Sequence, residues 1–252
     1  FNLFSDLAKS AEVEDLMAHT RRRLGVSRGL RIGLGVDRLD YTKGLMKRLW
    51  ALQEFFNRYP MYHGRFTFVQ VAIPTRNNVE VYRQYRELIR KTVMEINARF
   101  EVPSKGKSKG WKPIEYIEGR VTPATLVAYY RMADLTLVSS VYDGMNLVAK
   151  EFVASRPDAD GVLVLSAFAG ASRELTDAVL VNPFDEEQIA EAMHSALTMD
   201  PHERQRRMRK MRAVVAEGNI YRWIGKILST LLRFEFVPGE HVHRASLGAR
   251  VF

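Results

Sequence analysis

The sequence predicts an α/β fold built on a doubly wound, mostly parallel sheet, and two observations lead to this prediction. Short apolar runs recur along the chain, and each is followed by a longer stretch with apolar residues at helical spacing. Strands that are apolar along their whole length are typical of a parallel sheet covered by helices on both faces. Right-handed crossovers between such strands then give a doubly wound sheet.

Six segments have the continuous apolar character of buried strands. They are residues 31–36, 66–73, 114–117, 134–139, 161–166 and 178–182. Ligands of a doubly wound sheet bind beyond the carboxyl ends of its strands. We therefore expect functional residues in the loops that follow these segments.

Helices are predicted wherever apolar residues recur at spacings of three and four. They are residues 44–57, 78–100, 123–132, 145–154, 186–198, 201–217 and 220–234. Segment 104–110, SKGKSKG, has nothing to bury and is expected to form a loop or hairpin tip. We expect one domain over residues 1–235, followed by a tail without clear periodicity over residues 236–252.

The composition is that of a globular protein with room for one large core. The chain has 252 residues, of which 46% are hydrophobic and 27% charged. No run approaches the roughly 18 apolar residues of a membrane helix, and residues 1–17 lack the order of a signal peptide. The chain has no cysteine, which excludes disulfides and thiol catalysis. A cytoplasmic protein without membrane contact is the simplest expectation.

The formal net charge of +9 is compatible with nucleic acid, anionic lipid or phosphorylated small molecules as partners. The basic runs at 21–23 and 204–210 are not interleaved with aromatic residues, as they are in proteins that bind single strands. A solvated basic surface is the preferred interpretation, and no specific nucleic-acid binding is expected. His241 and His243 alternate in the tail, but two ligands are too few for a metal site.

Two cations follow the first predicted strand, in the run GVDRLDYTKGL at residues 35–45. Arg38 and Lys43 are five residues apart at the carboxyl edge of the sheet. Two cations at such a position can bind a diphosphate and neutralise a leaving group as its charge develops. Salt bridges with the neighbouring aspartates explain the spacing equally well. The run contains neither of the common glycine-rich nucleotide motifs.

The loop after the fourth predicted strand has the sequence SSVYDGMNLVAKEF, residues 139–152. Gly144 and Asn146 allow a close approach of the backbone to a ligand, and the next helix offers N–H groups to a diphosphate. Asp143 can accept hydrogen bonds from sugar hydroxyls, and Glu151 from a ribose diol. An ordinary turn and a surface glutamate are the competing interpretation. The position beside the switch region of a parallel sheet favours a ligand site.

Taken together, these runs resemble the signature segments of trehalose-6-phosphate synthases, which are retaining GT-B glycosyltransferases of family 20. The stretch at residues 161–193 resembles the next segment of the family. The resemblance covers roughly residues 25–230 and implies the C-terminal, donor-binding, Rossmann-like half of a two-domain enzyme. The N-terminal acceptor domain has no counterpart in this sequence. We therefore expect the isolated chain to be inactive, and to act with a missing N-terminal half or as a homo-oligomer.

The resemblance also implies roles for individual residues. Arg38 and Lys43 match the residues that hold the donor diphosphate, and we expect them to be catalytic. Asp143 matches the acid that binds glucose hydroxyls, and Glu151 matches the ribose ligand. Arg76 matches the residue that binds the phosphate of the acceptor. The other donor-site residues implied are Val121 and Leu126 beside the base, and Gly144, Met145, Asn146 and Leu147 beside the glucose and diphosphate.

The implied reaction transfers glucose from UDP-glucose to glucose 6-phosphate and yields trehalose 6-phosphate and UDP, with retention at the anomeric carbon. Neither a cofactor nor a metal is expected, because the cations take the place of a metal. A glucosylglycerol-phosphate synthase is one alternative, because it shares the donor half. A donor-binding module that is not catalytic alone is another. UDP is the first choice of nucleotide, with GDP and ADP left open.

Overall fold

The computed structural model describes residues 1–24, 29–76, 78–102, 110–218 and 220–232. The chain divides into two compact units, Phe1–Glu217 and Gly218–Phe252. All the strands found among the described residues belong to the first unit, which is therefore the unit that carries the predicted loops.

The first unit is built on a single six-stranded sheet in the order β3-β2-β1-β4-β5-β6, and every neighbouring pair is parallel. This confirms the predicted fold class and all six predicted strands. The order reverses between β1 and β4, which is the switch point of a doubly wound sheet. The strands are β1 (Arg31–Arg38), β2 (Phe66–Ile73), β3 (Ile114–Glu118), β4 (Leu135–Val138), β5 (Val162–Ser166) and β6 (Val179–Val181).

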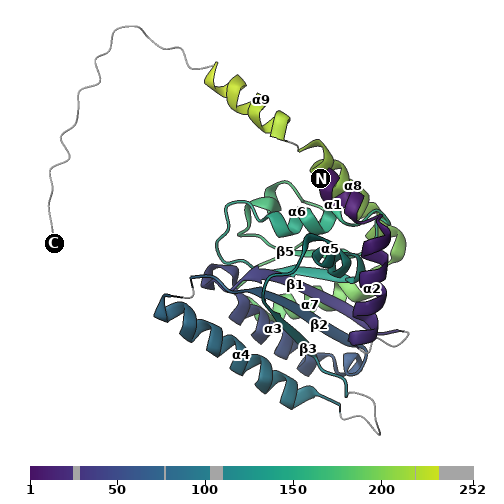
Figure 1. The fold of residues 1–252 in the computed structure, drawn as a ribbon, viewed down its shortest axis with the longest axis vertical. Helices are drawn as coiled ribbons and strands as arrows, with labels where there is room; N and C mark the ends of the chain where they lie inside the picture. The colour runs from purple at the N-terminus through teal and green to yellow at the C-terminus, as the bar shows by residue number, and fades with distance from the viewer. Residues whose placement is uncertain (25–28, 77, 103–109, 219, 233–252) are drawn as a thin grey trace, which may run out of the picture. The chain divides into compact units, whose positions relative to one another are not determined.

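Helices cover both faces of the sheet (Figure 1). One face packs against α3 (Leu45–Arg58), α4 (Glu80–Phe100) and α7 (Glu186–Thr198). The other packs against α1 (Asn2–Leu7), α2 (Ala11–Arg23), α5 (Pro123–Met132), α6 (Leu147–Ala154) and α8 (Pro201–Glu217). The described part of the unit also contains three short 3-10 turns, η1 (Tyr41–Lys43), η2 (Pro60–Tyr62) and η3 (Gly170–Arg173). The four inner strands β2, β1, β4 and β5 are buried over almost their whole length, which explains their continuous apolar character, whereas the edge strands β3 and β6 are partly exposed.

Helices α1 and α2 are additions to the elements predicted from the sequence. α2 has clear local signals, because the Ser10 hydroxyl accepts a hydrogen bond from the Val13 N–H at 3.3 Å and arginines fill the last turn. Val13, Met17 and Thr20 recur at helical spacing and are buried. This helix packs against α5 and covers one end of the core.

Two predicted boundaries next to the loops are wrong by two residues. β1 continues to Arg38, because Asp37 and Arg38 still pair with Ala72 and Ile73 of β2. Helix α6 begins at Leu147 instead of residue 145, because Asn146 has the left-handed φ of 69° and caps the helix from outside. The predicted loop at 104–110, except Gly110, and the tail at 236–252 lie outside the described residues.

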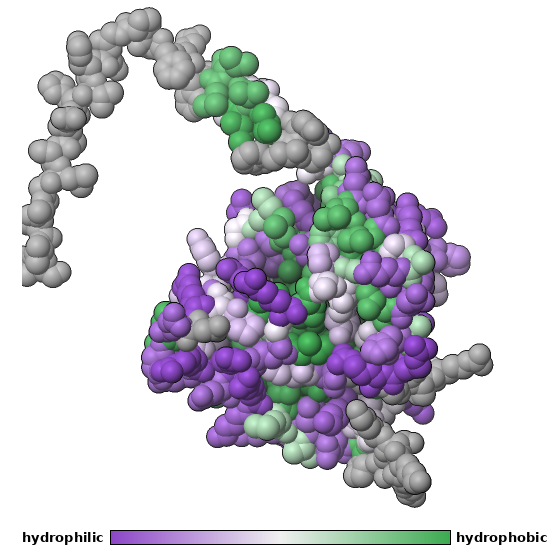
Figure 2. All heavy atoms as spheres, in the orientation of Figure 1, coloured by the Kyte–Doolittle hydropathy of each residue, from purple (hydrophilic) through white to green (hydrophobic). Residues whose placement is uncertain are grey.

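The described part of the second unit is essentially one helix, α9 (Ile220–Leu231). Figure 2 shows its apolar side chains in green. The exposed ones are Ile224, Ile227, Leu228 and Leu231, and Leu232, which directly follows the helix, is exposed as well. Among the described residues, no helix combines the length and apolar character that a membrane span requires.

Candidate functional site

A pocket of about 360 Å³ opens at the carboxyl edge of the sheet, where the strand order reverses between β1 and β4. This volume lies in the range typical of small-molecule sites. The pocket is lined by the ends of β1 and β2, by η1, by the loop that leads into α6 and by the first residues of α6. Its lining residues are Val36, Asp37, Arg38, Lys43, Ile73, Asp143, Met145, Asn146, Leu147 and Val148.

The loops after β1 and β4 are joined by backbone hydrogen bonds. The Thr42 carbonyl accepts from the N–H groups of Val141 at 2.9 Å and Tyr142 at 3.2 Å. Asp40 fixes the turn locally, since its Oδ1 accepts from the Thr42 N–H at 3.0 Å and from the Thr42 hydroxyl at 2.8 Å. Segments that lie about a hundred residues apart in sequence therefore form one side of the pocket.

Lys43 and Asp143 form an ion pair across these two loops. Lys43 Nζ lies 2.7 Å from Asp143 Oδ2, and each side chain is 14% exposed. Burial by itself would raise the pKa of the Asp143 carboxyl, but the hydrogen bond and charge of Lys43 outweigh burial and lower it. The spacing of Lys43 in the sequence pointed equally to the nearby aspartates, but its partner is the distant Asp143. The lysine is thus already at the pocket and neutralised there.

Arg38 differs from Lys43 in that its side chain is exposed at the pocket. Within the part of the chain that the structure describes, no hydrogen bond or ion pair holds its guanidinium. The neighbouring Asp37 turns away from it and binds Arg48 at 2.6 Å. Arg38 is therefore a cation available to an anionic ligand.

The turn from Asp143 to Asn146 is fixed by its own side chains. Asp143 Oδ1 accepts from the N–H groups of Met145 at 3.3 Å and Asn146 at 3.2 Å. Asn146 Oδ1 accepts from the Ala149 N–H at 2.9 Å and caps α6. Met145 and Leu147 stay largely exposed, so the turn presents the first residues of α6 to the pocket.

A third segment supports this turn from the side of β5. The Gly170 N–H donates to the Asp143 carbonyl at 2.9 Å, and the Ala171 N–H donates to the Met145 carbonyl at 2.7 Å. Both donors belong to η3. The backbone that carries the Asp143 carboxylate is therefore hydrogen-bonded both to the loop after β1 and to η3.

Glu151 lies in α6 outside the pocket lining, where its Oε2 accepts from the Tyr130 hydroxyl at 3.0 Å. Burial raises the pKa of the Glu151 carboxyl, with the hydrogen bond from Tyr130 acting in the opposite direction. Val121 and Leu126 are half-buried at the start of α5 and pack against the core on that face. These three residues do not line the pocket, and neither does Gly144.

Arg76 also lies outside the pocket lining, three residues after Ile73, which does line it. Its backbone has a positive φ of 48°, a conformation that costs free energy in a residue with a side chain. Its Nη1 donates to the Tyr82 hydroxyl at 2.6 Å, and its guanidinium lies 5.1 Å from the centre of the Tyr82 ring. The structure thus gathers six of the predicted site residues in one pocket and leaves five around it.

The sequence did not indicate that Val36, Asp37, Ile73 and Val148 line the pocket, nor that Arg48 pairs with Asp37. Arg48 did leave a signal, because it lies on the buried face of α3, four residues before Leu52. A charged residue at such a position needs a buried partner. That partner is Asp37.

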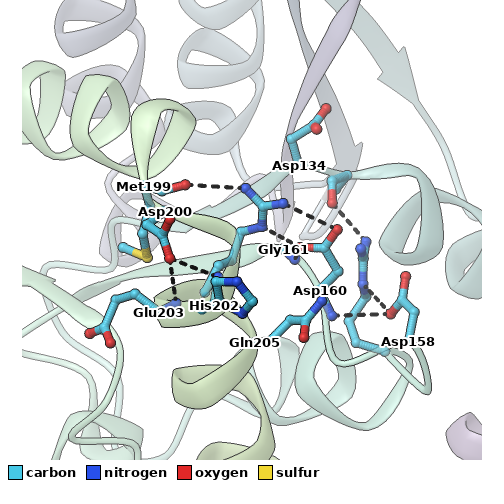
Figure 3. A network of polar contacts seen from close by, with 12 residues as sticks. Asp134, Asp158, Asp160, Gly161, Met199, Asp200, His202, Glu203 and Gln205 are labelled. Atoms are coloured by element: carbon cyan, nitrogen blue, oxygen red, sulfur yellow. Dashed lines mark hydrogen bonds and ion pairs between the residues drawn. The ribbon is translucent and has the colours of Figure 1, made fainter.

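A triplet of the form Asp-x-Asp, residues 158–160, invites comparison with metal sites. The structure places it just before β5, at the amino edge of the sheet and therefore away from the pocket. Asp158 pairs with Arg156 and Asp160 with Arg204, in the network that Figure 3 shows around Gly161 and Met199. Among the described residues, no three histidine or acidic side chains gather as a metal site.

The chain is similar to a known family of proteins. Residues 2–233 match the model of Glycosyltransferase family 20. The chain is 35% identical over 243 residues to the UDP-forming alpha,alpha-trehalose-phosphate synthase of Schizosaccharomyces pombe, covering 96% of this chain and 46% of that protein. It is 39% identical to the bifunctional trehalose-6-phosphate synthase/phosphatase of Thermoproteus tenax, over 88% of this chain and 29% of that protein.

The chain is also similar to solved structures over most of its length. The E. coli trehalose-6-phosphate structure bound with UDP-2-fluoro glucose superposes with a TM-score of 0.83 at 34% identity, over 93% of this chain and 50% of that one. The Burkholderia xenovorans alpha,alpha-trehalose-phosphate synthase in complex with glucose-6-phosphate gives 0.82 at 35% identity, over 91% and 49%.

The chain spans about half the length of the first of these relatives and of both solved structures. The family match nevertheless covers most of the chain, and the fold agrees with solved members over the same region. This protein belongs to glycosyltransferase family 20 and has the α/β architecture of one half of a GT-B enzyme.

Proposed function

We propose that this chain supplies the donor site of a retaining glucosyltransferase that uses UDP-glucose and glucose 6-phosphate and forms trehalose 6-phosphate and UDP. The observation that carries the proposal is the convergence of Arg38, Lys43, Asp143 and Asn146 on one pocket at the switch point of the sheet. The names of the relatives support the choice of donor and product, and the ligands of two solved structures support the choice of substrates.

The diphosphate of the donor is assigned to Arg38, Lys43 and the first turn of α6. Arg38 has no competing partner among the described residues, and Lys43 lies within the same pocket. Each charge-assisted contact of this kind is worth about 1.5–3 kcal/mol. The N–H groups at the start of α6 add the positive end of the helix dipole.

The residues that bind the remaining parts of the substrates are proposed from the resemblance to trehalose-6-phosphate synthases. Asp143 and the backbone from Gly144 to Leu147 bind the glucose, and Glu151 binds the ribose. Val121 and Leu126 flank the uracil. Arg76, steadied by the Tyr82 hydroxyl, binds the phosphate of the acceptor.

The proposed reaction needs no protein nucleophile. The acceptor hydroxyl attacks the anomeric carbon from the face on which UDP leaves, and the departing phosphate oxygen takes the proton of that hydroxyl. The protein positions the two substrates and stabilises the negative charge that develops on the leaving diphosphate. Arg38 and Lys43 are the proposed catalytic residues.

The first experiment is calorimetric titration of the chain with UDP-glucose, with ADP-glucose and GDP-glucose alongside. We expect UDP-glucose to bind best. Arg38→Ala and Glu151→Ala should each weaken binding by about ten- to hundredfold, because each removes a charge-assisted contact. Arg209→Ala, an exposed arginine on α8, is the matched control and should bind as the wild type does. Equal binding by Arg38→Ala would contradict the proposed diphosphate site.

A second candidate is a donor-binding module that is not catalytic by itself. The observation that favours it is that the pocket contains most of the residues assigned to the donor, whereas Arg76, the residue assigned to the acceptor phosphate, lies outside its lining. Release of UDP from UDP-glucose and glucose 6-phosphate should be measured for the chain alone and after fusion to the preceding half of the Schizosaccharomyces pombe relative. Turnover only in the fusion supports the module, whereas turnover by the chain alone excludes it. The cytoplasmic location stays a prediction.

A further inference from the structure

Arg48 is the largest completely buried side chain among the described residues of the first unit. It projects from the first turns of α3 to the sheet beneath the pocket. Its Nη1 donates to Asp37 Oδ2 at 2.6 Å and to Gln70 Oε1 at 2.8 Å, and its Nε donates to Ser139 Oγ at 3.1 Å. One guanidinium therefore binds three residues that are far apart in sequence.

These three partners lie in or directly after three adjacent strands, β2, β1 and β4. Asp37 is in β1, Gln70 is in β2, and Ser139 directly follows β4. Gly35 makes this arrangement possible, because a Cβ at that position would collide with Nη1 of Arg48. The guanidinium thus ties the sheet together on both sides of β1, close to the carboxyl ends of the strands.

The same contacts continue into both loops of the pocket. Ser139 Oγ donates to the Gly44 carbonyl at 3.3 Å, which connects the end of β4 to the turn that carries Lys43. Asp37 lines the pocket and directly precedes Arg38. The residues bound by Arg48 therefore adjoin Arg38 and Lys43, which are proposed to bind the diphosphate.

Stability alone is a weak reason for this arrangement. Burial raises the pKa of the Asp37 carboxyl, and Arg48 offsets only part of that effect. Arg48 Nη2 is buried without a hydrogen-bond partner among the described residues. Apolar residues of similar volume are often as stabilising as a buried ion pair, but they cannot fix three strands through directional bonds.

We propose that Arg48 is a positioning residue, which fixes the loop of Arg38 and Lys43 against the loop of Asp143 and thereby sets the affinity for the donor diphosphate. The effect on affinity rests on the proposed function. The contact between the two loops does not, because hydrogen exchange measures it without a ligand.

The test compares Arg48→Lys with Arg204→Lys. Arg48→Lys keeps the charge and loses the planar fork. Arg204→Lys makes the same exchange in a partly buried pair with Asp160 at the opposite edge of the sheet. Hydrogen exchange is followed at the amides of Val141 and Tyr142, which bond the Thr42 carbonyl, and UDP is titrated by calorimetry.

We expect Arg48→Lys to speed exchange at these two amides by about tenfold and to weaken UDP binding by about tenfold. Both effects correspond to the loss of about one hydrogen bond that holds the two loops together. Amides of β5 should keep wild-type exchange in this variant. Arg204→Lys should leave both readouts unchanged. Ser139→Ala removes one arm of the network with little change in volume, and it should give a smaller effect in the same direction even if Arg48→Lys fails to fold.

Wild-type exchange and UDP affinity in both Arg48→Lys and Ser139→Ala would overturn the inference, and so would faster exchange spread evenly over the sheet. Absence of UDP binding by the wild-type chain would count against the proposed function, while selective exchange at Val141 and Tyr142 would still support the role of Arg48 in the loops.

Discussion

Lys43 and Asp143 show how a single residue pair sets the state of the pocket. Lys43 is proposed to bind the diphosphate and Asp143 the glucose, yet in the structure they bind each other at 2.7 Å. A nucleotide diphosphate must compete with Asp143 for the lysine. A donor that also carries glucose offers hydroxyl groups to Asp143 in exchange. We therefore expect the pair to favour UDP-glucose over UDP.

Asp143→Asn tests this competition. Neutralising residue 143 frees Lys43 for phosphate, so UDP should bind about three- to tenfold more tightly, whereas the preference for UDP-glucose over UDP should shrink. Calorimetric titration with both ligands measures the ratio. Lys43→Met serves as the comparison and should weaken binding of both. A loss of UDP affinity in Asp143→Asn would show that the ion pair does not restrain the lysine.

Glu151 is predicted to weaken the fold at neutral pH. Its pKa is raised by burial, so its favourable contribution is present below its ordinary value of 4.5 and is lost as the pH rises through the higher folded value. Glu151→Gln should therefore unfold at a higher temperature than the wild type at pH 7, while UDP affinity falls by about tenfold. Glu191→Gln, at an exposed position of α7, is the control for both measurements. Lower stability of Glu151→Gln at pH 7 would contradict this prediction.

At the scale of elements, the pocket depends on how closely the turn before α3 approaches the end of β4. Gly44 has a φ of 66°, and a Cβ at that position would collide with the Ser139 carbonyl. Only glycine satisfies both demands without displacing one loop from the other.

Gly44→Ala should lower the free energy of unfolding by about 2–4 kcal/mol, through backbone strain and steric overlap together. Gly64→Ala separates the two effects, because Gly64 has a φ of 73° and open space around it. It should lower the free energy of unfolding by about 1–2 kcal/mol. Urea unfolding of the two variants and the wild type gives both values. Equal losses in the two variants would show that contact with Ser139 contributes nothing.

At the scale of the whole first unit, carboxylates with lowered pKa values link distant elements. Glu118 at the end of β3 binds Arg86 and Arg90 of α4. Burial alone would raise the pKa of Glu118, but the two arginines lower it below its ordinary value of 4.5. The pKa values of Asp143 and Asp160 are lowered in the same way by Lys43 and Arg204. Such groups stabilise the fold above their ordinary pKa, and this contribution is lost as the pH falls through the folded value.

The free energy of unfolding should therefore decrease as the pH falls below 4.5, the ordinary pKa of Glu118. Glu118→Gln should be less stable than the wild type at pH 7 and should lose less stability between neutral and acid pH. Chemical unfolding at a series of pH values measures the two curves. Parallel curves for the variant and the wild type would mean that Glu118 does not contribute to acid unfolding.

The sequence by itself determined the class of the fold and the loops in which to look. Continuous apolar runs identify buried parallel strands because burial on both faces leaves no room for alternation, and parallel strands place their following loops at one edge. The long runs around Arg38 and Asp143 were specific enough to indicate the family, which the comparisons then showed.

Only the tertiary structure decided which residues meet. Lys43 pairs with Asp143 rather than with an aspartate of its own loop, and Asp37 faces Arg48 rather than Arg38. The choice depends on the register of β1 against β2 and β4, which brings together segments about a hundred residues apart. The spacing of residues along the sequence predicts only which residues are close within one local segment. Long-range pairing is set by the packing of the whole sheet, and so the same residues acquire their partners only when the fold is complete.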